Sequence, residues 1–309
     1  MGRKSPPPGP SRRIPKAAER VAAAPPVAID HSPTAGAHTS DYTLFDFGYA
    51  TDPGATAHYA DPAYYAATYR DRRHDVAYYA QKAKLSGGPV LEYGVGNGRV
   101  ALHVARAGVQ IEGIDLSQPM LDDFARRLKN EPPKIRARVT LHQGDMRTLR
   151  LGRQFALVTA PFNAILHLYD RRDFEAFFEG VRSHLTDDGS FLFDFSVPQA
   201  DDLCRDPAKG FSAPELLHPE TGERVTYSER FEYDPLRQVL LARLEFTPQA
   251  GSAPFSVPLT QRQIFPREME ALLHYNGFEQ ILFTADFTDL ACDHYVDSIV
   301  VSCRRRRGA

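Results

Sequence analysis

The sequence predicts an α/β fold with one mostly parallel sheet and an antiparallel β insertion after its fifth strand. Three observations lead to this prediction. Apolar runs alternate with amphipathic segments of helical period as far as residue 197. A glycine-rich turn, GVGNG at 94–98, follows the first of these runs. Period-2 stretches without an intervening helix lie between Tyr227 and Phe265. Strands separated by helices pair in parallel, whereas strands joined by short turns pair antiparallel.

Composition limits the classes of protein to consider. The 309 residues include 42% hydrophobic residues, enough to build a sizeable core. A formal net charge of −2 gives no general attraction for nucleic acid or an anionic membrane. Cys204, Cys292 and Cys303 are widely spaced and form no CxxC pair, so we expect no disulfide framework, no metal site and a reducing, cytoplasmic setting. We also expect no membrane span and no secretory signal.

The two ends differ from the rest of the chain. Residues 1–40 are basic and rich in Pro and Ala, with almost no aromatic or branched apolar content, and we expect a disordered tail. RNA contact or an organellar transit peptide are alternative roles for it. The folded domain is predicted over 41–303, followed by a second basic tail, RRRRGA, at 304–309.

The first half of the domain supplies the parallel strands. One or two helices, with Tyr65, Tyr69, Val76 and Tyr79 at helical spacings, precede the strand at 90–93. A helix that stops at Gly108 and a strand that ends in Asp115 complete a β-α-β unit. Ser117 is the predicted N-cap of the next helix. Later strands reach Asp145, Pro161 and residue 197, with a helix over 170–186 before the last of them.

The pattern changes between residues 197 and 265. Three stretches alternate apolar and polar residues, which predicts an antiparallel meander. The α/β alternation then resumes with a helix from Pro266, a stop at Gly277 and two final strands. The residues expected to share a face in each stretch are Val225, Tyr227, Phe231 and Tyr233; Leu240, Ala242, Leu244 and Phe246; and Phe255, Val257, Leu259 and Phe265.

The glycine turn and Asp115 together suggest a ligand. In an open parallel sheet, ligands bind beyond the carboxyl ends of the strands, and glycines without Cβ atoms let a ligand approach the main chain. Asp115 ends the second strand about 20 residues later, where a carboxylate suits the two hydroxyls of a ribose. An adenosine-containing ligand is therefore predicted, with a purely structural turn as the alternative.

The motif set resembles class I S-adenosylmethionine-dependent methyltransferases. The turn reads GxGxG, and Arg99 stands where the dinucleotide fingerprint GxGxxG has its last glycine. LEYGVGNG, GIDLS, QGDM and APFNAILHL are similar, in order and spacing, to the first four motifs of the family. The resemblance extends from about Tyr65 to the last strand. It implies a Rossmann-like, seven-stranded, mostly parallel sheet with a C-terminal antiparallel hairpin.

The resemblance also implies residues that bind S-adenosylmethionine. The acid of the first motif is Glu92; the glycines would face the methionine part, and Asp115 the ribose. Leu116 and Met120 would flank the adenine, with core packing as the alternative for Met120. Asp145 would accept from the adenine amino group, or simply cap a turn. The implied set is Tyr69, Glu92, Gly94, Gly96, Gly98, Asp115, Leu116, Met120, Asp145, Met146 and Pro161.

Methyl transfer needs alignment more than a covalent catalyst. The donor brings its own leaving group, so positioning and a dry pocket supply most of the rate gain. An amine acceptor must still present a free lone pair, which a nearby side chain can assist. The candidates are Asn163 and His167, on one helical face if NAILHL is helical. A hydrogen-bonded core histidine is the alternative for His167.

The fourth motif and the insertion bear on the acceptor. Enzymes that methylate amino groups of bases commonly carry Asn or Asp before Pro-Pro and an aromatic residue, whereas this chain has Ala160-Pro161-Phe162-Asn163. We therefore expect a small-molecule N- or O-methyltransferase, with the insertion 197–265 roofing the site as a lid. RNA methylation assisted by the basic tails, a non-catalytic cofactor-binding protein and a nicotinamide oxidoreductase are the alternatives. The sequence gives no indication of the oligomeric state.

Overall fold

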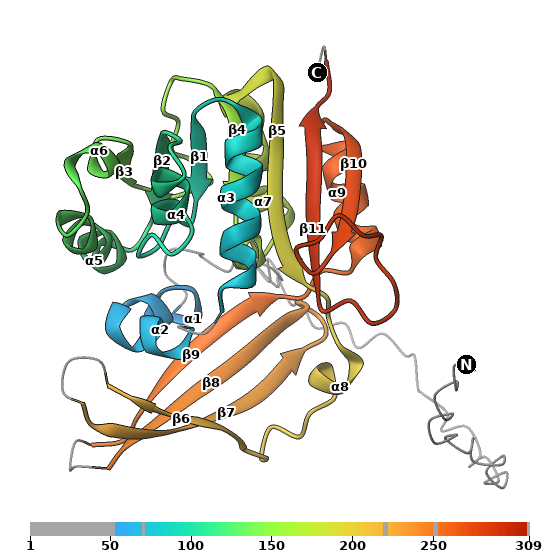
Figure 1. Ribbon diagram of the computed structural model, residues 1–309. Coiled ribbons are helices and arrows are strands. Elements are labelled where there is room, and N and C mark those ends of the chain that lie inside the picture. The colour runs from blue at the N-terminus through green and yellow to red at the C-terminus, as the bar shows by residue number, and fades with distance from the viewer. Residues whose placement is uncertain (1–52, 70–71, 219–221, 250–252, 308–309) are drawn as a thin grey trace, which may run out of the picture. The chain divides into compact units, whose positions relative to one another are not determined.

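The computed structural model describes residues 53–69, 72–218, 222–249 and 253–307. The predicted tail over 1–40 lies outside these residues. Two sheets organise the described part of the chain, one of seven strands and one of four (Figure 1).

The seven-stranded sheet has the order β10-β11-β5-β4-β1-β2-β3. Strands β1 to β5 pair in parallel. Strand β11 runs antiparallel to β5, and β10 runs antiparallel to β11. This arrangement confirms the predicted sheet and its C-terminal antiparallel hairpin. The strands are β1 (Val90–Tyr93), β2 (Ile111–Asp115), β3 (Val139–Gln143), β4 (Phe155–Ala160), β5 (Leu185–Ser196), β10 (Phe278–Ala285) and β11 (Ser298–Arg305).

Helices cover both faces of this sheet. Side chains alternate between faces along a strand, so Val90 belongs to one buried cluster and Leu91 to the other. The first cluster includes residues of α3 (His74–Ser86), α4 (Ala101–Arg106) and α5 (Gln118–Lys129), and the second includes residues of α7 (Arg171–His184) and α9 (Pro266–Tyr275). A four-residue helix, α6 (Pro133–Arg136), precedes β3. Ser117 caps α5 as predicted, because its hydroxyl accepts from the Met120 amide.

The antiparallel insertion lies between β5 and α9. A short helix, α8 (Ala200–Leu203), leads into the meander β6 (Phe211–Leu217), β7 (Arg224–Asp234), β8 (Val239–Pro248) and β9 (Phe255–Arg262). Three of these strands were predicted, whereas β6 was missed. Pro214 interrupts its pattern, and a proline is tolerated at an edge strand, which is where β6 lies. The inclusion of Phe265 in a strand face was wrong, since it directly precedes α9 and is exposed.

The inner face of the meander packs on the segment before β1. Tyr227, Leu244 and Phe246 form a buried cluster against Tyr64 of α2 (Pro62–Thr68). On the same segment, α1 (Pro53–Thr56) and η1 (Ala57–Tyr59) contact β9. Residues 53–65, which we call the cap, therefore lie against the four-stranded sheet (Figure 1).

The last strand is longer than predicted. Arg304 and Arg305 were assigned to the basic tail, but they continue β11 and pair with Glu279 and Phe278. The Arg306 amide also donates to the carbonyl of Gly277. Backbone pairing with β10 therefore extends into the arginine run.

In the ranges given above, no helix has both the length and the apolar character that a bilayer span requires. Cys204, Cys292 and Cys303 are all free thiols.

We expect Gly98→Ala to destabilise the protein strongly. Gly98 has a φ of +77°, and an added Cβ would lie 2.2 Å from the ring of the fully buried Phe124. Left-handed strain and overpacking together predict a loss of about 3 kcal/mol or more, measured by urea unfolding.

Gly108→Ala is the matched control. Gly108 has a φ of +99° but nothing within 4 Å of an added Cβ, so only backbone strain of about 1 kcal/mol is expected. Equal losses in the two variants would contradict the packing role assigned to Gly98.

Candidate functional site

A cavity of about 380 Å³ opens at the carboxyl ends of β1, β2, β3 and β4. Three parts of the chain build it: the turns that follow these strands, the first turn of α5, and the cap. The lining residues are Ala55, Thr56, Ala57, Tyr59, Ala60, Tyr65, Gly94, Gly96, Ile114, Asp115, Leu116, Ser117, Gln118, Pro119, Met120, Gly144, Met146, Pro161, Phe162, Ala164 and His167. We call this cavity the main pocket.

Asp115 organises the floor of the main pocket. Its Oδ2 accepts from the Gly96 amide at 2.7 Å, and its Oδ1 accepts from the Ser117 amide at 2.8 Å. Burial raises the pKa of Asp115 to about 6, although these backbone donors oppose the shift. Each carboxylate oxygen retains a further lone pair, so the group is able to accept hydroxyl donors from a ligand.

Glu92 lies beneath the glycine turn, in β1. The side chain is 1% exposed, and its Oε2 has no hydrogen-bond partner. Burial raises the pKa of Glu92 to about 8, and the nearby Asp115 and Asp75 add to the shift while Arg99 opposes it. A buried carboxyl oxygen without a partner is costly, and it marks a place where a ligand with a donor or a positive charge is favoured.

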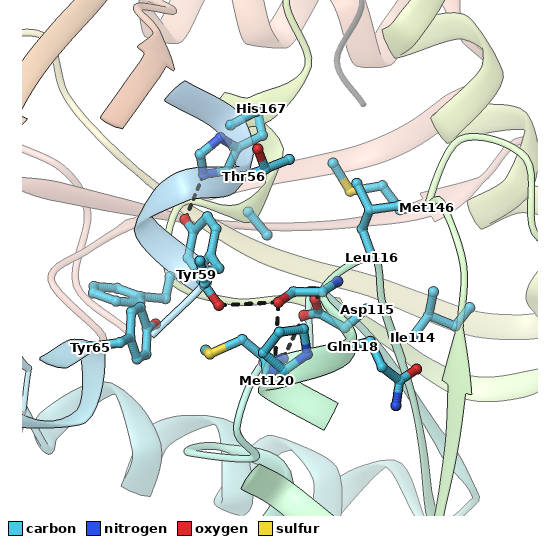
Figure 2. A pocket seen from close by; sticks show the side chains of 18 of the residues that line it. Thr56, Tyr59, Tyr65, Ile114, Asp115, Leu116, Gln118, Met120, Met146 and His167 are labelled. Atoms are coloured by element: carbon cyan, nitrogen blue, oxygen red, sulfur yellow. Dashed lines mark hydrogen bonds between the residues drawn. The ribbon is translucent and has the colours of Figure 1, made fainter. Parts of the chain in front are cut away.

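Apolar side chains gather on one side of the main pocket. Figure 2 shows Ile114, Leu116 and Met146 on that side and Tyr65 on the other. Met120 is 1% exposed yet still lines the cavity, so core packing and ligand contact are compatible there. These flat or flexible surfaces suit an aromatic base.

The cap closes the cavity with residues that the sequence analysis did not assign to the site. Thr56, Tyr59 and Tyr65 line it, and the Ser117 hydroxyl donates to the Tyr59 carbonyl at 3.1 Å. The dense run of tyrosines over 59–69 was the available signal. Spacing placed Tyr65 on a helix, but it could not show which cavity the ring borders.

His167 lies in the pocket wall and is held by Tyr59. The Tyr59 hydroxyl and Nε2 of His167 share a hydrogen bond of 2.7 Å (Figure 2). Burial, together with the nearby His58, lowers the pKa of His167 to about 4. The imidazole is therefore neutral at pH 7 and is a weak base.

Asn163 does not share a helical face with His167. Only Ala164–His167 form a 3-10 helix, η2, and Asn163 precedes it with a left-handed φ of +61°. Its Oδ1 accepts from the Ser196 amide at 2.8 Å, and its Nδ2 donates to the Ser196 hydroxyl at 3.1 Å. The prediction of a common face was wrong, because this side chain ties the turn after β4 to the end of β5.

Asp145 is engaged by an arginine. The Arg147 guanidinium and amide both donate to its carboxylate, and Gly144 and Met146 line the main pocket instead. Burial alone would raise the pKa of Asp145, but these donors hold it below its usual range. This geometry agrees with the turn-capping alternative, and contact with an adenine amino group stays a prediction.

Two further implied residues also lie away from the main pocket. Gly98 packs against Phe124, as described above. The Tyr69 hydroxyl bonds to Nε2 of His58 at 3.0 Å, and its ring borders a second cavity. Among the implied cofactor residues, those that line the main pocket are Gly94, Gly96, Asp115, Leu116, Met120, Met146 and Pro161.

The insertion does not line the main pocket. No residue of 197–265 that the structure describes is among the lining residues, and the cap stands between β9 and the cavity. The predicted lid over 197–265 therefore supports the covering segment, whereas residues 53–65 do the covering. No cluster of three or more potential metal ligands occurs in the parts of the chain listed above.

Comparison with known proteins shows similarity to methyltransferases. Residues 90–189 match the family model described as a methyltransferase domain. A dTDP-3-amino-3,6-dideoxy-alpha-D-glucopyranose N,N-dimethyltransferase of Streptomyces fradiae is 31% identical over 121 residues, which cover 39% of this chain and 44% of that protein. A cypemycin N-terminal methyltransferase of a Streptomyces species is 27% identical over 154 residues, or 48% and 57% of the two chains. The chain thus spans about half the length of these curated relatives.

Solved structures confirm the fold. The methyltransferase CcbJ of Streptomyces caelestis superposes with a TM-score of 0.66 at 24% identity, over 76% of this chain and 97% of that one. DesVI of Streptomyces venezuelae gives 0.60 at 21% identity, over 77% and 95%. The glycopeptide N-methyltransferase MtfA, solved with S-adenosylmethionine, gives 0.52 at 24% identity, over 75% and 94%. The family match and the fold confirm the resemblance to class I S-adenosylmethionine-dependent methyltransferases.

The residues of the main pocket fit that cofactor. Asp115 offers acceptors for ribose hydroxyls, the apolar side suits an adenine, and the unpartnered Oε2 of Glu92 lies in the strand below the glycine turn. The sulfonium and ammonium groups of S-adenosylmethionine are cationic, which compensates for two buried carboxyls.

We expect the stability of the ligand-free protein to fall as pH rises from 7 to 8.5. Glu92 has a pKa of about 8, raised from 4.5, so the folded state binds more protons than the unfolded state across this range. Stability therefore decreases with pH, by about 1 kcal/mol for this group. Glu92→Gln removes the decrease, measured by urea midpoints at both pH values.

Glu112→Gln is the control, because it neutralises a carboxylate in the neighbouring strand β2 that is paired with His142 and Arg153. This variant keeps the wild-type pH response. A wild-type midpoint that does not change between pH 7 and 8.5 would refute the assignment of a raised pKa to Glu92.

Proposed function

We propose that this chain, whose residues 90–189 match a methyltransferase domain, transfers the methyl group of S-adenosylmethionine to an amino nitrogen of a small molecule. The observation that carries the proposal is the coincidence of the motif residues with one cavity. Gly94 and Gly96 of the glycine turn, Asp115, Met146 and Pro161 come from four strand ends, and all border the main pocket.

The choice of a nitrogen acceptor draws on the relatives. The Streptomyces fradiae protein is named as a sugar N,N-dimethyltransferase and the cypemycin enzyme as an N-terminal methyltransferase. Both names describe transfer to an amine. The fourth motif, Ala160-Pro161-Phe162-Asn163, departs from the pattern typical of base-methylating enzymes and supports a small molecule rather than a nucleic acid.

The protein's contribution to the reaction is alignment. When bound, the cofactor supplies an activated methyl group with its own leaving group. Asp115 and the Gly96 amide fix the floor of the pocket, and the cap excludes water from above. Holding donor and acceptor in line converts a bimolecular encounter into an oriented reaction, which is a large share of the rate gain available.

Tyr59 and His167 are the polar groups we assign to the acceptor. His167 is a neutral hydrogen-bonding group at pH 7, because its pKa of about 4 leaves it unprotonated. That pKa is too low for it to hold a proton taken from an alkylammonium. We therefore assign His167 to orienting the amine, with the Tyr59 hydroxyl fixing the ring.

Asp115→Asn tests cofactor binding. Loss of the charged acceptor should weaken binding of S-adenosylhomocysteine by about tenfold to a hundredfold in calorimetry. Asp145→Asn is the matched control, and we expect less than about a threefold effect, because Arg147 occupies that carboxylate. A wild-type protein that binds neither S-adenosylmethionine nor S-adenosylhomocysteine would remove the basis of the proposal.

Transfer itself is tested with methyl-labelled donor and paired acceptors. Amino sugars, their hydroxyl counterparts and short peptides with free N-termini form the panel, and mass spectrometry detects the product. We expect label on amines and not on the hydroxyl counterparts. On the amine found, Tyr59→Phe and His167→Asn should lower kcat by about tenfold while changing cofactor affinity by less than about threefold.

The pH profile of kcat separates orientation from base catalysis. Because His167 is neutral throughout, kcat between pH 6 and 9 should follow only the deprotonation of the acceptor amine, in the wild type and in His167→Asn alike. An inflection near pH 6.5 that disappears in His167→Asn would show instead that this imidazole takes the proton.

A further inference from the structure

A second cavity, of about 670 Å³, lies on the other side of the glycine turn. We call it the arginine cavity. It shares only Tyr65 with the main pocket, among the residues that line each of them. Its lining residues are Tyr65, Ala66, Tyr69, Arg72, Arg73, Val76, Ala77, Ala80, Asn97, Arg99, His103, Arg106 and Arg127.

The charges in this lining are of one sign. Five arginines contribute positive charge, and no Asp or Glu of the described chain is among the lining residues. Guanidinium groups repel one another, so such a cluster is unfavourable unless carboxylates or a bound anion compensate.

Two carboxylates behind the lining compensate part of this charge. Asp75 is fully buried and forms a two-point ion pair with Arg99, at 2.6 and 2.8 Å. The same carboxylate is 3.7 Å from Nε of Arg72. Glu131 pairs with Arg106. Among the four arginines Arg72, Arg99, Arg106 and Arg127, the ion pairs involve two carboxylates, Asp75 and Glu131, so these four carry two more positive charges than their partners carry negative ones.

Arg127 shows the excess most clearly. Its Nη1 donates to the Asn97 carbonyl at 2.7 Å, and no carboxylate oxygen of the described chain lies within 4 Å of it. Burial lowers the pKa of Arg127; Asp123 opposes this shift, and the neighbouring Arg106 and Arg126 add to it. The bond to Asn97 uses one of its five N–H donors, and the side chain lines the cavity.

Arg72 adds a donor that makes no hydrogen bond, although it lies at ion-pair distance from Asp75. Its Nε is buried and has no hydrogen-bond partner, while its guanidinium lies 4.5 Å from the centroid of the Phe162 ring. The cavity between Arg72 and Arg127 also has an apolar wall formed by Val76, Ala77 and Ala80 of α3. A ligand therefore meets charged groups and an apolar surface together.

We propose that the arginine cavity binds a phosphorylated small molecule, at the same time as the cofactor occupies the main pocket. A phosphate or diphosphate group carries two or more negative charges, which matches the excess, whereas a single carboxylate would leave one cation uncompensated. Arginine also binds phosphate through two parallel N–H donors. The volume and the α3 wall accommodate a body larger than the phosphate itself.

Calorimetry with pyrophosphate, on the full chain at low ionic strength, tests this site. The wild type should bind pyrophosphate, and saturating S-adenosylhomocysteine should change its Kd by less than about threefold. Arg106→Gln/Arg127→Gln should weaken pyrophosphate binding by at least about tenfold. This double variant should keep the wild-type affinity for S-adenosylhomocysteine, so failure of this site is distinguishable from failure of the proposed function.

Arg126→Gln is the control for general charge. Arg126 precedes Arg127 in α5 and pairs with Asp123, but it does not line the cavity, so pyrophosphate binding should be unchanged. Three results would overturn the proposal: no binding by the wild type, an equal loss in Arg126→Gln, or displacement of pyrophosphate by S-adenosylhomocysteine. The last would assign the cavity to the cofactor's own carboxylate. Urea midpoints equal to wild type establish that the variants fold.

Discussion

The pocket depends on a single carboxylate that joins two strand ends. The Asp115 carboxylate accepts hydrogen bonds from the amides of Gly96 and Ser117, so one side chain holds both the turn after β1 and the turn after β2. The parallel register sets this distance, because Tyr93 lies opposite Ile114 at the same edge of the sheet. Without that acceptor, the amides of Gly96 and Ser117 would lose their hydrogen-bond partner, and no side chain would fix the position of the glycine turn relative to the end of β2.

Two buried carboxyl groups, those of Glu92 and Asp115, lie at this edge of the sheet and link ligand binding to stability. Glu92 and Asp115 both have raised pKa values because burial disfavours their charged forms. An empty pocket is therefore less stable at neutral pH than one that holds a cation, and binding energy and folding energy become linked. Functional sites commonly carry such local destabilisation, since it is relieved only by the ligand for which the site is shaped.

The strand ends were predictable, whereas the directions of individual side chains were not. Gly96 and Asp115 are recognisable because strand length and turn spacing are local properties. Asn163 and Gly98 instead depend on partners far along the chain. Asn163 is hydrogen-bonded to Ser196, 33 positions away, and the Phe124 ring occupies the space beside Gly98. For Asp145 the adenine contact stays a prediction, because a carboxylate at a strand end is equally able to bind an adjacent arginine, as it does with Arg147. Motif spacing thus predicts where a turn lies and leaves open which groups of the turn face the cavity.

The covering of the pocket follows from packing between distant segments. Gly54 lies so close to Thr260 of β9 that an added Cβ would be 2.5 Å from its side chain, and Tyr169 bonds both the carbonyl and the hydroxyl of Thr260. Tyr59, five residues after Gly54, then reaches His167 and the N-cap of α5. The insertion therefore contacts the cap, and the cap in turn lines the cavity at the strand ends. Since the cap and β9 are about 200 residues apart in sequence, local pattern analysis does not detect their contact. We expect a change in β9 to alter a pocket that β9 does not itself line, because the cap lies between them.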